Sequence, residues 1–81
     1  MTTEKKLWTF ELSADGDRLD IHCDPAGLKE MIDHLTRLAS VRSLPNHDHW
    51  MAPSWAGDEL TEEKQGKDAK LIRHVKVHLW P

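Results

Sequence analysis

The chain is poor in cysteine, tyrosine and phenylalanine. Its 81 residues include a single cysteine, Cys23, no tyrosine and one phenylalanine. One cysteine excludes an internal disulfide and favours a reducing compartment, so we expect a cytoplasmic protein. No apolar run reaches the ~20 residues that cross a bilayer, and polar residues rather than a signal-peptide core follow Met1. We therefore expect no membrane partner.

Positive charge is also in short supply. Eleven Lys and Arg residues oppose 14 Asp and Glu residues, which gives a net charge of −3. This balance argues against nucleic acid as the partner, because a phosphate backbone favours a basic patch. The four glycines are scattered and form no phosphate-binding loop. A chain of this length builds one domain, residues 1–81, with little room for an enclosed active site.

Alternating and helical apolar patterns dominate the first half of the chain. Residues 7–12 and 18–23 alternate on either side of a Gly16 turn, which predicts an antiparallel hairpin. Asp24 and Pro25 are typical of a helix start, and the helix should end near Ser40. Its apolar residues fall within one stripe, which we expect to face the core: Leu28, Met31, Ile32, Leu35, Leu38 and Ala39.

Two further strands are predicted in the second half. Residues 46–51 form a short third strand, residues 61–70 a mobile loop, and residues 71–80 the last strand. In that last strand the alternation places Leu71, Val75, Val77 and Leu79 on one face and Ile72, His74, Lys76, His78 and Trp80 on the other. The order β-β-α-β-β predicts an α+β fold with two layers. We expect an antiparallel sheet of about four strands with one helix packed on one face.

The segment 47–60 concentrates large aromatic and charged side chains in a part of the chain that reads as strand end and loop. Tryptophan is enriched at binding hot spots, and carboxylates can meet Lys or Arg on a partner. We therefore predict a partner-binding site made of His47, Asp48, His49, Trp50, Trp55, Asp58 and Glu59. The alternative for the two tryptophans is closure of the core at the end of the sheet. For Asp58 and Glu59 it is helix capping or solvation.

Two histidines on one strand face raise the alternative of a metal-binding module. His47 and His49 would lie about 7 Å apart, close enough for two imidazoles to reach one zinc ion. A third ligand would come from among Asp58, Glu59, His22, His74 and His78, and nothing selects among these. Hydrogen bonding by the histidines is the favoured interpretation, so we expect no metal and no cofactor.

The sequence contains no arrangement of residues that is typical of a catalytic site. Cys23 lies on the predicted core face of a strand, where a thiol is inert. Asp48 and His49 are adjacent in a predicted strand and would point to opposite faces. We predict no catalytic residue and no enzyme activity. A further alternative is a homodimer whose open sheet face buries Leu7, Ile72 and Trp80, because association helps a small domain.

The motifs HDHWMAPSWAGDELTEEKQG and LIRHVKVHLWP resemble bacterial immunity protein family 32 of polymorphic toxin systems. The segment LSADGDRLDIHCDPAGLKEMIDHLTRLA is similar in layout, with a hairpin and an Asp-Pro-x-Gly helix start, so the resemblance covers nearly the whole chain. Its most specific part is the His-Asp-His tract with the Pro-Ser-Trp-x-Gly and Glu-Leu that follow. The resemblance implies a non-enzymatic antitoxin that binds a cognate toxin and blocks its active site or substrate entry.

Overall fold

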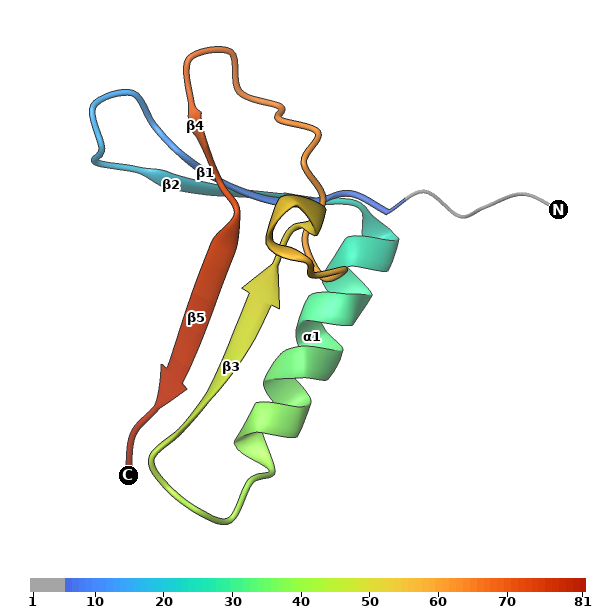
Figure 1. The fold of residues 1–81 in the computed structure, drawn as a ribbon, viewed down its shortest axis with the longest axis vertical. Coiled ribbons are helices and arrows are strands. Elements are labelled where there is room, and N and C mark those ends of the chain that lie inside the picture. Colours follow the sequence, from blue (N-terminus) through green and yellow to red (C-terminus); the bar gives the residue numbers. More distant parts are fainter. Residues whose placement is uncertain (1–5) are drawn as a thin grey trace, which may run out of the picture.

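The computed structural model describes residues 6–81, which fold into one helix and two antiparallel sheets (Figure 1). The elements are β1 (Trp8–Leu12), β2 (Leu19–Cys23), α1 (Pro25–Ala39), β3 (Asn46–Met51), the short 3-10 helix η1 (Pro53–Trp55), β4 (Lys70–Ile72) and β5 (His74–Leu79). The α+β class is confirmed. In place of one sheet of about four strands there is a sheet of order β2-β1-β4 and a β3-β5 ribbon. Residues 1–5, which bear on the expected lack of a signal peptide, lie outside this description.

The first two strands form the predicted hairpin. Trp8 pairs with Cys23 and Leu12 with Leu19 in antiparallel register. Gly16 adopts φ +78° in the turn, where its N–H donates to the carbonyl of Ser13 at 2.9 Å. A residue without Cβ adopts this left-handed conformation at little cost. The turn residues therefore determine which residues of the two strands face each other.

Strand β1 is buried on both faces. Trp8 and Phe10 enter the core, while Thr9 and Glu11 on the opposite face are fully buried as well. Glu11 accepts hydrogen bonds from the Thr9 hydroxyl at 2.7 Å and from the N–H groups of Gln65 and Gly66 at 2.9 and 2.7 Å. Burial raises the pKa of Glu11, yet these hydrogen bonds outweigh burial and hold the pKa below its usual 4.5. The buried carboxylate thus fastens the 61–69 loop onto the sheet.

Helix α1 begins and ends close to where the sequence predicts. The Asp24 side chain accepts from the Gly27 N–H at 2.7 Å, and Pro25 occupies the first turn. Gly27 lies against the backbone that leads into β1: a Cβ at this position would sit 2.0 Å from the Leu7 carbonyl oxygen. Only glycine allows this approach, so the sequence brings the helix start directly onto the first strand.

The helix is rotated relative to the predicted apolar stripe. Leu38 is buried and Met31 packs partly against the core, but Leu28, Ile32 and Leu35 are 44%, 51% and 43% exposed. The core-facing side instead runs through Gly27, Met31, His34 and Leu38, about 100° from the exposed residues. The contact of Gly27 with Leu7 orients the helix this way. The expectation that the whole stripe faces the core is therefore wrong.

The last predicted strand is divided into β4 and β5 at Arg73. Ile72 and Val75 both pack against the core, whereas an unbroken strand would place them on opposite faces. The Arg73 carbonyl accepts from the N–H of Ala52 at 2.9 Å, so the chain switches here from β1 to β3 as its neighbour. The single strand expected over residues 71–80 is corrected accordingly. Ile72, one of the residues assigned to a homodimer face, is used by this chain's own core.

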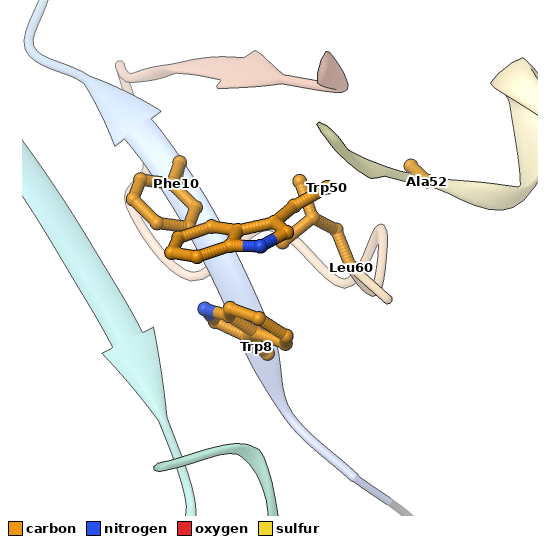
Figure 2. Close-up of a cluster of buried hydrophobic side chains, with 5 residues drawn as sticks. All are labelled: Trp8, Phe10, Trp50, Ala52 and Leu60. Atoms are coloured by element: carbon orange, nitrogen blue, oxygen red, sulfur yellow. The ribbon is translucent and has the colours of Figure 1, made fainter. Parts of the chain in front are cut away.

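The core lies where the two sheets meet. Figure 2 shows Trp8 and Phe10 from β1 beside Trp50 from β3, with Ala52 and Leu60 completing the cluster. The ring centroids of Trp8 and Trp50 are 5.0 Å apart, and those of Phe10 and Trp50 are 5.9 Å apart. This packing fixes β3, and through it the orientation of the β3-β5 ribbon.

Candidate partner-binding site

The β3-β5 ribbon has two chemically different faces. Trp50 pairs with Val75 and Asp48 with Val77, and both valines pack against the core. Side chains alternate along a strand, so the intervening pairs point away from the core. These outward pairs are His47 with His78, His49 with Lys76 and Met51 with His74.

Six rings form a continuous row over the outward face, which we call the ring row: Trp55, His74, His49, His47, His78 and Trp80. Consecutive ring centroids are 5.2, 5.1, 4.9, 6.1 and 6.2 Å apart. The tryptophans at its ends are 56% and 69% exposed. An exposed row of this kind offers aromatic surface together with N–H donors, the combination enriched at protein interfaces.

A hydrogen bond between two imidazoles stands in the middle of the row. His49 Nδ1 lies 2.8 Å from His74 Nε2, so one ring donates and the other accepts. Burial lowers the pKa of His49, and the positive fields of His47, Lys76 and His74 lower it further, against a smaller opposite effect of Asp48. When His74 Nε2–H donates this hydrogen bond, His49 Nδ1 accepts it, and His49 is then neutral.

The alternative of a metal site finds no complete ligand set in residues 6–81. No group of three or more His, Cys, Asp or Glu side chains there is placed to hold an ion. His47 and His49 do share a face, with centroids 4.9 Å apart. His22 lies on the other sheet, 3.9 Å from Glu11.

Trp50 and Asp48, both predicted to contact a partner, point inward. Trp50 is 3% exposed, and its indole N–H donates to Asp48 Oδ2 at 2.9 Å. The same oxygen lies 3.1 Å from His34 Nδ1 on α1. Burial raises the pKa of Asp48, but the hydrogen bonds from Trp50 and His34 more than compensate and lower it overall. For Trp50 the core-closing alternative holds, which corrects its assignment as a surface contact.

The free edge of β3 is capped by side chains. In an antiparallel ladder every second N–H points away from the neighbouring strand, and an unpaired edge invites pairing with another chain. Here each of these N–H groups donates a hydrogen bond to a side-chain oxygen. The His47 N–H donates to Asn46 Oδ1 at 2.7 Å and the His49 N–H to Asp48 Oδ1 at 3.0 Å. The Met51 N–H donates to Glu59 Oε1 at 2.9 Å. Asp48 and Glu59 therefore close the edge of the strand that carries the ring row.

Trp55 and Asp58 remain on the surface, where the sequence predicts them. Trp55 ends η1, which is held by the hydrogen bond from the Ser54 N–H to Glu62 Oε2 at 3.0 Å. Sequence reasoning assigned no function to Lys76 and placed Trp80 only in the alternative homodimer face. It gave His74 and His78 no role beyond a place among the metal candidates. The signal that finds them is their alternation in residues 71–80 combined with the pairing register of β3 and β5.

A hollow of about 320 Å³ opens beside the ring row, between α1 and β3. His47 borders both the row and the hollow, which is also lined by His34, Arg37 and Asp48. Arg37 Nη2 lies 2.9 Å from His34 Nδ1 and brings a guanidinium to the rim. A partner that covers the row at His47 therefore also reaches this hollow.

Comparison with known proteins places the chain in a family. The model described as Immunity protein 32 matches residues 18–75, more than half of the sequence. The chain belongs to the Immunity protein 32 family. No curated protein and no solved structure shows significant similarity to it.

The Immunity protein 32 match contains most of the ring row. It includes His47, His49, Trp55 and His74, whereas His78 and Trp80 follow its end. The family assignment predicted from the sequence motifs is confirmed.

In the part of the chain that the structure describes, no helix combines the length and apolar character needed to span a bilayer.

Proposed function

We propose that this Immunity protein 32 member is an antitoxin that binds and neutralises the cognate toxin of a bacterial polymorphic toxin system. Family membership supports the role, and the exposed ring row supports the surface. The protein acts in the cytoplasm by covering the toxin's active site or substrate entry, without catalysing a reaction itself.

Docking uses the ring row, with Trp55 as an anchor and Asp58 beside it. Trp55 combines a large apolar ring with an N–H donor and is 56% exposed, so a partner can bury much of its surface. His47 and His49 extend the contact along β3. Asp48, Trp50 and Glu59, also predicted in the site, contribute by holding β3 in place rather than by meeting the toxin.

Binding to the toxin domain encoded beside the gene tests this proposal. Replacement of a hot-spot tryptophan costs about 2 kcal/mol or more, so Trp55→Ala should weaken binding by about 30-fold. Ile32→Ala on α1 is the matched control, because Ile32 is a similarly exposed apolar residue at 51% and lies outside the row. We expect that variant to bind within about twofold of the wild type.

Circular dichroism must show that both variants remain folded. A folded Trp55→Ala variant that binds as tightly as Ile32→Ala would exclude the ring row as the docking surface. Failure of the wild-type protein to bind the toxin, or to protect cells that express it, would exclude the antitoxin role itself.

A further inference from the structure

The outward face of the β3-β5 ribbon differs in charge from the chain as a whole. The sequence carries 14 acidic and 11 basic residues. The six outward-facing residues of β3 and β5 nevertheless include no carboxylate. They are four histidines, one lysine and one methionine: His47, His49, His74, His78, Lys76 and Met51. Lys76 lies at the centre, opposite His49. The surface potential where a partner docks is therefore set by cationic and cation-forming groups.

Three carboxylates near this face already have partners. Asp48 accepts from the Trp50 indole on the inward side, and Glu59 accepts from the Met51 N–H. Glu62, near the Trp55 end, accepts from Ser54 and lies 4.0 Å from the Arg73 guanidinium. On the outward face of β3 and β5 the imidazoles and Lys76 are therefore the groups available to an incoming partner, whereas the exposed Asp58 lies on the loop after η1.

We infer that the ring row receives a carboxylate-rich segment of the toxin, which Lys76 and the histidine N–H groups bind while Trp55 and Trp80 pack against its apolar neighbours. This inference rests on the proposed function and specifies the chemistry of the partner surface. It runs opposite to the whole-chain charge, which favours a basic partner. The local arrangement decides, because at physiological salt charges act over roughly 8 Å.

Nucleic acid is the other polyanion to consider, and the structure favours protein. Binding to a phosphate backbone draws on several Lys and Arg side chains along one track. The outward face of β3 and β5 has one such residue, Lys76, and the chain's net charge of −3 opposes a long polyanion. A short acidic segment needs only the few donors that the row provides.

Proton uptake gives this inference a distinctive signature. The titratable and charged groups near His49 are His47 and Asp48 on its own strand and His74 and Lys76 on β5. Burial and the three basic neighbours lower the pKa of His49, and Asp48 has a smaller opposite effect. His49 in the free protein therefore favours its neutral form. A bound carboxylate favours the charged imidazole and raises its pKa. The complex then binds more protons than the free protein, so affinity increases as the pH falls.

Calorimetric titration with the adjacent-gene toxin domain measures this effect. Between about pH 8 and about pH 6 we expect the Kd to fall about tenfold or more, because uptake of one proton can change affinity up to tenfold per pH unit. The variant His49→Asn should lose most of that dependence, because His49 is the group whose pKa is lowered in the free protein. Since the toxin is the same in both titrations, its own titrating groups cancel in the comparison.

A charge reversal provides a second, pH-independent readout. Lys76→Glu should weaken binding about tenfold or more, because like charges across an interface repel. Lys29→Glu makes the same change in net charge on α1, where Lys29 is 78% exposed, and should stay within about twofold.

Three outcomes would overturn the inference. Binding that is constant or weaker at low pH, with Lys76→Glu equal to Lys29→Glu, leaves the antitoxin role intact but excludes an acidic docking segment. A fluorescent single-stranded RNA oligonucleotide bound as tightly as the toxin would assign the row to nucleic acid. No toxin binding at any pH would remove the proposed function together with this inference.

Discussion

Replacement of Glu11 by glutamine tests how the 61–69 loop is held. The buried carboxylate accepts three hydrogen bonds, from the Thr9 hydroxyl and the N–H groups of Gln65 and Gly66. Glutamine keeps one oxygen, so at either rotamer its amide N–H₂ faces a backbone N–H that loses its acceptor. A buried unpaired donor costs about 1–3 kcal/mol, and loss of charge weakens each remaining hydrogen bond by about 1 kcal/mol. The relieved cost of burying a charge offsets part of this, which leaves a net loss of about 2–4 kcal/mol.

Urea denaturation followed by tryptophan fluorescence measures the loss, since Trp8 and Trp50 are buried. Glu63→Gln is the matched control, because Glu63 is exposed on the same loop and should cost less than about 0.5 kcal/mol. In a domain of this size each kcal/mol also lowers Tm by about 4–8 °C.

The pH dependence gives an independent check on Glu11. Its pKa in the folded state lies below the usual 4.5, so the ionised carboxylate stabilises the fold fully above that value and this contribution is lost as the pH falls through the folded pKa. The stability difference between wild type and Glu11→Gln should therefore narrow in acid. A Glu11→Gln variant within about 0.5 kcal/mol of wild type at neutral pH, or a difference that persists unchanged in acid, would refute the reasoning.

Two further predictions concern α1. Ile32→Glu should change the free energy of unfolding by less than about 1 kcal/mol, because Ile32 is 51% exposed. Leu38→Ala should lower it by about 2–3 kcal/mol, because Leu38 is buried. Equal losses for these two variants in urea denaturation would contradict the observed rotation of the helix. Gly27→Ala should cost about 2 kcal/mol or more, because its Cβ would lie 2.0 Å from the Leu7 carbonyl oxygen. A Tm equal to that of wild type for Gly27→Ala would show that the helix start is not pressed against the first strand.

Local patterns predict most of the elements and the pairing of the first two strands, but not how the remaining elements contact one another. Alternation and a Gly16 turn define the hairpin, and the Asp24 cap with Pro25 defines the helix start. The face of the helix is decided elsewhere, by the close approach of Gly27 to Leu7. A glycine within a helical pattern does not indicate which backbone segment it will contact. The apolar stripe alone therefore predicted the wrong orientation of the helix relative to the core.

Burial of polar residues is the second feature that periodicity leaves out. Glu11 follows the alternation of a solvent-facing residue, and only the return of Gln65 and Gly66 to that face buries it. His34 likewise packs between Trp8 and Trp50, with centroids 5.9 and 6.0 Å away, although its type is that of a surface residue. Both depend on partners more than 10 positions away, about which a local window carries no information.

For the same reason, the sequence alone predicts only part of the ring row. The segment that contains His47, His49 and Trp55 stands out by composition. Assembly of the row also needs the register that sets His78 opposite His47, and a shift of one residue would send it to the other face. Alternation does place Trp50 on the face of Asp48, opposite His47 and His49, so these four residues could not all belong to one surface.

Strand β3 separates folding from recognition by this alternation. Its inward residues Asp48 and Trp50 join the core through the indole N–H and the imidazole of His34. Its outward residues His47 and His49 pack instead against each other and against His78 and His74. Substitutions on the outward face can therefore change the partner surface with little loss of stability, whereas substitutions on the inward face unfold the strand that presents it. For the proposed antitoxin role this separation is an advantage, because the partner surface can change while the scaffold stays folded.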